Sequence, residues 1–252
     1  MRVKVSGVVK IIDEEGHVFT YKNQIQSSFI QAIIQYAQVG GTVSNYAYSL
    51  QLLDSNGDIL GDYTGALSYK QVSNVLEATF GFVTTAVPGG VSQLQLYVSS
   101  SLGTTLIAVA NNVNLPVNSS LQVLWTISFT ISPNDYFTPY LIFAFLAPPS
   151  QPGVFTPNVQ TAYNEIVGGN YLTSPPSYYL SYGTTTIKLT PNFTQNSIQV
   201  AYDITNITST TSIYNIQLYA TGQITNVLLL SPIQQVTVQP GQVISVYYYA
   251  TW

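Results

Sequence analysis

Alternation of apolar and polar side chains with a period of two dominates this chain. In LQVLWTISFTI, residues 121–131, six apolar side chains fall on one face and polar side chains fill most of the other. Successive side chains of a strand point to opposite faces, so the stretch predicts a half-buried strand. Similar short stretches, separated by turn residues, recur along the chain. They predict an all-β fold of antiparallel β-sandwich or jelly-roll type.

The first 39 residues follow two other patterns. Two apolar stretches flank Asp13-Glu14-Glu15-Gly16, so residues 1–22 are predicted to form a β-hairpin. In NQIQSSFIQAIIQYAQVGG the apolar residues recur at helical spacing, and two glycines follow. This predicts one short helix over residues 23–39, ended by Gly40-Gly41.

A short word occurs twice and points to an internal repeat. Gln-Leu-Tyr stands at 95–97 and again at 217–219, an offset of 217 − 95 = 122. At the same offset, residues 76–82 align with 198–204, and apolar positions fall on the same face. A one-residue slip would turn a strand inside out, so shared parity over two strands is a stronger signal than three shared letters. Tyr97 and Tyr219 are predicted to face outward, as surface contact candidates.

The repeat predicts two homologous β-sandwich domains, residues 1–147 and 154–252, of which the first carries the hairpin and the helix. Residues 147–153, APPSQPG, contain three prolines and fit a stiff linker. A single large sandwich with coincidental strand similarity is the alternative.

Charged side chains are scarce. They make up 6% of the chain, against about 25% in an ordinary soluble domain. Without a clustered basic face the chain has no footprint for nucleic acid. Protonating every carboxylate would move the net charge only from −4 to +7, that is six Lys and Arg plus His17. We therefore expect a surface of amides, hydroxyls and phenols, and little sensitivity to acid.

Targeting signals are missing from the sequence pattern. The N-terminal stretch has no uninterrupted apolar core before Lys10, so no secretory signal is predicted. The longest nearly continuous apolar run, 140–147, is far shorter than the roughly 20 residues of a spanning helix, so no membrane insertion is predicted. With no Cys, neither disulfides nor thiolate metal sites are available.

Candidate chemistry is sparse. The single His and the absence of Cys leave little for nucleophilic catalysis, so no enzyme, catalytic residue or cofactor is predicted. Asp13, Glu14, Glu15 and His17 are candidates for a metal site. Adjacent side chains on a tight turn point in different directions, however, so a solvated turn is favoured. No metal site is predicted. A carboxylate pair for glycoside hydrolysis is disfavoured, because no acid lies between Glu77 and Asp135.

The segment Asp54-Ser55-Asn56-Gly57-Asp58 is similar to the start of a calcium-binding loop. Its Gly stands fourth rather than sixth, and no Glu follows at the twelfth position. The segment is better explained as a hairpin with a type I′ turn at Asn56-Gly57. Three sequons make Asn118, Asn192 and Asn206 candidates for glycosylation.

Several segments together carry a family resemblance. LEATFGFV, QLQLYV and LQVLWTISF, in this order, resemble a unit of tail-fibre and other virion surface proteins of tailed phages. The Asp/Glu-Gly hairpin followed by Asn and a helix is similar to the opening of several such proteins. Two such units in an uncharged, Tyr-rich chain also resemble the tandem jelly-roll turret proteins of turreted icosahedral archaeal viruses. The Gly that usually precedes Leu-Tyr in the phage unit is missing, so tail fibre and turret both stay open.

This resemblance implies a virion structural protein on the particle exterior, made in the host cytoplasm and acting in assembly and host attachment. The partners it implies are further copies of the chain, other virion proteins, and a host surface glycan or pilus. A cell-surface appendage subunit or carbohydrate-binding module of an archaeon is the alternative function.

Overall fold

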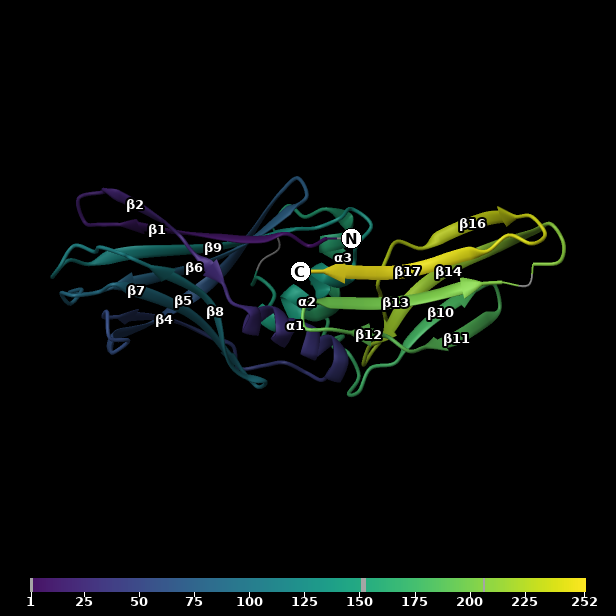
Figure 1. Cartoon of the computed structure of the whole chain (residues 1–252), viewed down its shortest axis with the longest axis horizontal. Coiled ribbons are helices and arrows are strands. Elements are labelled where there is room, and N and C mark those ends of the chain that lie inside the picture. Colours follow the sequence, from purple (N-terminus) through teal and green to yellow (C-terminus); the bar gives the residue numbers. More distant parts are fainter. Residues whose placement is uncertain (1, 151–152, 206) are drawn as a thin grey trace.

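The computed structural model describes residues 2–150, 153–205 and 207–252. It has two β-rich regions at opposite ends of a long molecule, with helices between them (Figure 1). All strand pairs within the sheets are antiparallel, so the predicted all-β class is confirmed. The N-terminal region contains β1 (Val5–Ile12), β2 (Val18–Lys22), β3 (Gln24–Ile25), β4 (Ala47–Leu53), β5 (Ile59–Val72), β6 (Val75–Thr84), β7 (Gln93–Ser100), β8 (Gly103–Asn111) and β9 (Leu121–Thr130).

The N-terminal strands form one sheet in the order β2-β1-β9-β6-β5-β4-β7-β8-β3. Its two edge strands are joined by the single residue Asn23, so the sheet rolls until both edges end on one segment, 18–25. The Asn23 amide nitrogen faces the Gly7 carbonyl at 2.8 Å, and its oxygen accepts from the buried Trp125 indole. A β-carbon on Gly7 would overlap this amide, so a glycine is needed there.

The C-terminal region has two smaller sheets. Five strands lie in one, with β11, β10, β14 and β15 in order and β16 paired to β14; three lie in the other, in the order β12-β13-β17. Their bounds are β10 (Tyr178–Tyr182), β11 (Thr185–Leu189), β12 (Asn192–Phe193), β13 (Ser197–Ile204), β14 (Thr211–Thr221), β15 (Asn226–Leu228), β16 (Ile233–Val238) and β17 (Ile244–Thr251).

Strand pairing follows the same order in both regions. The path β9-β6-β5-β4-β7-β8 corresponds to β17-β13-β12 and then β11-β10-β14-β16. The predicted parity is confirmed by burial: Leu94, Leu96, Ile216 and Leu218 are all buried. The division of the chain at residues 147–153 stays a prediction, and residues 151–152 of that linker lie outside the described residues.

The prediction of one helix was wrong, since the described residues contain α1 (Ser27–Val39), α2 (Phe137–Leu146) and α3 (Pro157–Val167). The predicted start at residue 23 was also wrong, because Gln24 and Ile25 pair with β8. The apolar run 140–147 contributes most of α2, whose residues are all buried. A helix that is apolar on every face is typical of a helix surrounded by hydrophobic core.

Both ends of α2 are satisfied by groups from other elements. At its C-terminal end, Tyr46, Tyr48 and Tyr69 donate hydroxyl hydrogen bonds to the carbonyls of residues 144, 146 and 147. These carbonyls have no partner inside the helix. At the other end, Asp135 Oδ1 accepts from the backbone N–H groups of residues 137 and 138. The helix is therefore anchored to the N-terminal sheet by phenols and begins on a carboxyl group.

This arrangement corrects the expectation that the phenols belong to the surface. Several tyrosines are buried, because the long ring fills the core while the hydroxyl reaches an unpaired carbonyl. Burial raises the pKa of Tyr48 far above its usual value. The buried tyrosines among the described residues are Tyr36, Tyr48, Tyr140, Tyr163, Tyr178 and Tyr248.

Candidate functional site

A polar groove of about 460 Å³ lies at one end of the N-terminal sheet. One wall is the β4–β5 turn, residues 54–57. The other wall comes from Ser92 and Gln93, where β7 begins, and from Asn111 and Asn112, where β8 ends. The lining consists of polar side chains and one glycine. Sites of small ligands commonly measure about 300–1,000 Å³, so the groove is large enough to hold one.

The β4–β5 turn is closed by several hydrogen bonds of its own. Asp54 N–H donates to the Asp58 carbonyl at 3.0 Å, and Gly57 N–H donates to the Asp54 carbonyl at 3.3 Å. Gly57 has a φ of 88°, whereas Asn56 is not among the residues with positive φ. The predicted type I′ turn was therefore wrong, because that turn needs positive φ at both central residues. The Asp54 carboxylate instead accepts from the N–H groups of Asn56 and Asp58.

A relay of hydrogen bonds runs along the outer face of β7 into this groove. The Tyr97 hydroxyl donates to Gln95 Oε1, Gln95 Nε2 donates to Gln93 Oε1, and Gln93 Nε2 donates to Asn111 Oδ1. The relay has one direction, and it leaves the amide nitrogen of Asn111 as its final donor at the groove. Tyr97 is half-buried, so it faces outward as predicted but lies against its neighbours. Burial raises its pKa, and the charge of Asp62 adds to this effect.

Tyr219 lies on the outer side of β14 and is also half-buried. Its ring stacks on that of Tyr179, with centroids 5.6 Å apart and planes inclined by 23°. In the strand register, Lys188 stands opposite Tyr179, and Leu228 stands opposite Tyr219. Both tyrosine candidates thus belong to outer sheet faces, but they lie in different regions of the molecule and form no common site.

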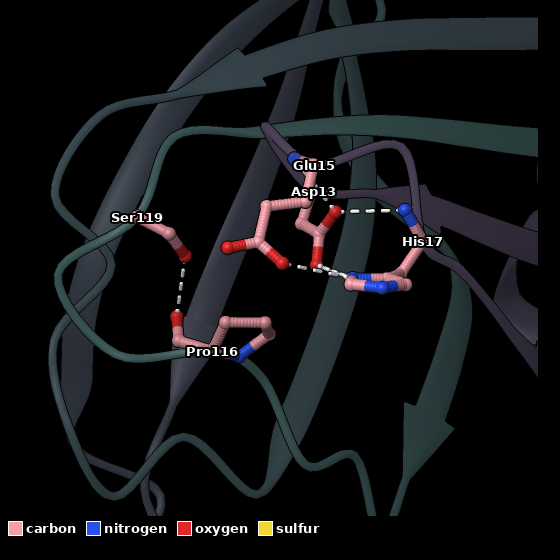
Figure 2. A network of polar contacts seen from close by, with 5 residues as sticks. All are labelled: Asp13, Glu15, His17, Pro116 and Ser119. Atoms are coloured by element: carbon pink, nitrogen blue, oxygen red, sulfur yellow. Dashed lines mark hydrogen bonds and ion pairs between the residues drawn. The ribbon is translucent and has the colours of Figure 1, made fainter.

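The β1–β2 turn has the same hydrogen-bond pattern as the β4–β5 turn. Figure 2 shows the side chains of Asp13, Glu15 and His17 on this turn. Asp13 N–H donates to the His17 carbonyl at 3.1 Å, and Asp13 Oδ1 accepts from the N–H groups of Glu15 and His17. The His17 ring lies 2.9 Å from Asp13 Oδ2 and 3.6 Å from Glu15 Oε2. Glu14 points elsewhere and accepts from Ser120 N–H. Among the described residues, no group of three or more His, Cys, Asp or Glu could hold a metal ion.

The pKa values of the turn carboxyl groups are lowered, whereas that of His17 is raised. The hydrogen bond to Asp13, together with its charge, raises the pKa of His17. At Asp13 desolvation is the largest single influence and raises the pKa, but the hydrogen bonds and charge of His17 together outweigh it and lower the pKa of that carboxyl. Backbone hydrogen bonds, first that of Asp58, lower the pKa of Asp54. Both turn carboxylates therefore stay ionised further into acid than free Asp.

The sequons lie in different settings. Asn118 is exposed in the loop before β9 with a φ of 58°, and its N–H donates to the Val87 carbonyl at 2.8 Å. Asn192 is exposed at the start of β12. Asn206 lies outside the described residues. Glycosylation of these asparagines stays a prediction.

Asp135 is the buried acid that sequence reasoning missed. Its side chain is fully buried, and its Oδ2 has no hydrogen-bond partner among the described residues. Burial raises its pKa to about 6. The Thr138 hydroxyl next to it lies 3.0 Å from the hydroxyl of the buried Tyr248. A local signal could have found it: an acid shortly before an apolar stretch is typical of a helix N-terminus, and Asp135 stands two residues before Phe137, where α2 begins.

Comparison with known proteins places the chain among viral proteins. It is 53% identical over 256 residues to the uncharacterized protein ORF258 of Acidianus filamentous virus 2 (isolate Italy/Pozzuoli), covering all of this chain and 99% of that protein. The chain belongs to the family of this archaeal virus protein. No family model matches the chain, and no solved structure matches it. Within the described residues, no helix is long and apolar enough to cross a membrane.

Proposed function

We propose that this protein is a non-enzymatic structural component of the virion exterior, made in the host cytoplasm and acting in assembly and host attachment. The observation that carries the proposal is the full-length relationship to a protein of a filamentous archaeal virus. It favours a virion protein over a cellular appendage subunit. Turrets belong to icosahedral capsids, whereas the related protein comes from a filamentous virus. A fibre or terminal appendage therefore suits this family better than a turret.

The physical character of the chain supports this role. Charged residues make up only 6% of it, so acid outside the host cell would break few ion pairs. The outer faces of the sheets carry amides and hydroxyls, which can form hydrogen bonds with a partner without ion pairs. Outer faces of this kind suit self-association and contacts with other virion proteins.

Exposed apolar side chains give self-association a location. Val18 and Val83 are 59% and 67% exposed. They are the two ends of one cross-strand row on the outer face of the sheet. The row runs from Val83 in β6 through Gln122 in β9 and Ile12 in β1 to Val18 in β2. Covering these apolar side chains with another subunit would stabilise an assembly. We expect a homo-oligomer.

The proposal is tested on particles purified from an infected culture. Mass spectrometry is expected to find the protein in the purified virions, and gold-labelled antibodies are expected to bind intact particles at their surface or ends. Pre-immune serum is the control. A protein that stays in the host cytoplasm and is absent from purified particles would overturn the proposal.

A further inference from the structure

We infer that the polar groove between the β4–β5 turn and the adjoining ends of β7 and β8 binds an uncharged oligosaccharide. The inference rests on the proposed function, because attachment needs a ligand on the host cell. The groove itself is defined by the chain alone and can be tested without a virus.

The chemistry of the walls selects the class of ligand. Asn56, Gln93, Asn111 and Asn112 bring side-chain amides to the groove, and serines bring hydroxyls. An amide presents donors and acceptors together, which suits neighbouring hydroxyls of a sugar ring. No Lys, Arg or His lines the groove, so a phosphate or sulfate would meet no compensating charge. No apolar side chain lines it either, which disfavours an apolar ligand.

The single carboxylate of the groove is already engaged. Asp54 Oδ1 accepts from the N–H groups of Asn56 and Asp58 at 2.8 and 2.9 Å, and its Oδ2 accepts from Asn56 Nδ2 at 3.2 Å. These bonds lock the turn and orient the Asn56 amide. The turn wall is therefore set before any ligand arrives, and little ordering is needed on binding.

The opposite wall is set in the same way. The relay from Tyr97 through Gln95 and Gln93 fixes the orientation of the Asn111 amide. Next to it, Asn112 adopts a φ of 56°, a conformation uncommon for residues other than Gly. Residues held in sparsely populated backbone conformations gather at functional sites. Hydrogen bonds therefore orient the amides of Asn56, Gln93 and Asn111 at the groove, and the backbone conformation of Asn112 places a fourth amide beside them.

The repeat offers an internal comparison. In the C-terminal region the turn between β10 and β11 is closed by the pair Tyr182 and Thr185, with two residues between them. No five-residue Asp turn projects there beside β14. A groove of this composition therefore belongs to the N-terminal region, and a glycan bound by the full chain should respond only to changes in that region.

The test uses the purified full chain on an array of neutral hexose and N-acetylhexosamine oligomers printed beside sulfated and sialylated ones. A neutral oligomer that binds is then titrated by calorimetry. Replacing Gln93 and Asn111 together by Ala is expected to weaken its binding about tenfold or more, since the Asn111 amide and the partner that orients it are both lost. The matched control is Gln199→Ala, which removes an exposed amide from β13 in the other region and should leave binding unchanged.

A second variant guards against misfolding. Asn112→Gly removes the amide at a position whose positive φ glycine adopts freely, so thermal unfolding should be unchanged while binding weakens. Binding of no neutral oligomer, binding of anionic oligomers only, or equal affinity in these variants overturns the inference. Mass spectrometry of virions tests the proposed function independently. If the protein is found in virions but binds no glycan, only this inference is wrong. If it binds a glycan but is absent from virions, only the proposed function is wrong.

Discussion

The N-terminal and C-terminal regions share one order of strand pairing, yet the first forms a single rolled sheet and the second forms two. The difference lies in the strand between β4 and β6. In the N-terminal region β5 runs without interruption for 14 residues and pairs with both neighbours. Its counterpart is divided into β11 and β12, and Pro191 stands between them. Proline lacks the backbone N–H that a ladder needs, so one residue separates the sheet into two.

The two regions also treat their free edges differently. The edges of the N-terminal sheet meet on residues 18–25, where Asn23 bonds to Gly7 and Trp125. The C-terminal region instead divides its strands between two sheets, with β12 and β17 at the edges of one and β11 and β15 at the ends of the other path. The N-terminal region therefore keeps one continuous ladder, and the polar groove lies at one end of it.

The largest effect is expected from transferring the interruption. Ser68→Pro places a proline in β5, opposite Thr79 in β6, and should lower the unfolding free energy more than the other changes described below, because it removes a backbone N–H and fixes φ within the ladder. Urea denaturation followed by circular dichroism measures it. Pro191→Ala is the matched control and should change stability by less than about 1 kcal/mol. Equal stability of the Ser68→Pro variant and the natural chain would refute the role given to a continuous β5.

A smaller effect is expected at the start of α2, where the regions meet. Since burial raises the pKa of Asp135 from 3.8 to about 6, the folded state binds its proton more tightly than the unfolded state. Stability is then greatest below pH 4 and falls as pH rises toward 6, by about 3 kcal/mol in order of magnitude. Asp135→Asn retains the acceptor for residues 137 and 138 but cannot ionise.

Thermal unfolding between pH 3 and 7 checks this. The Asp135→Asn variant should lose the decline between pH 4 and 6 and should be more stable than the natural chain at pH 7. Asp203→Asn, at an exposed position of β13, should keep the decline. If the variant and the natural chain have parallel pH profiles, Asp135 does not titrate as described. The composition-based expectation of indifference to acid would then hold at this position too.

The smallest effect concerns closure of the N-terminal sheet. Asn23→Ala leaves the buried indole N–H of Trp125 without its acceptor and should cost about 1–3 kcal/mol. Guanidinium denaturation measures the loss, and hydrogen exchange should show faster exchange in the edge strands β2 and β3. Gln24→Ala, at the exposed neighbouring position, is the control. Unchanged exchange at both edges would show that Asn23 does not hold them together.

The sequence by itself determined which face of each long strand is buried. The run 121–131 and the repeated Gln-Leu-Tyr strands followed their predicted parity, because side chains of a strand alternate whatever its neighbours are. The hairpin at Asp13–His17 and the end of α1 at Gly40 were also predictable, since turn and cap residues act within a few positions of the chain. Such local signals need no tertiary contacts.

Only the tertiary structure decided the roles of the apolar run 140–147, of the buried tyrosines and of the polar groove. The run 140–147 carries no periodicity, and it is helical because core from both regions surrounds it. Tyr48 and Tyr69 bond to carbonyls 98 and 78 residues away, contacts that no local pattern encodes. The groove likewise joins residue 54 to residues 93 and 111, so its amides become neighbours only when β4, β7 and β8 pair.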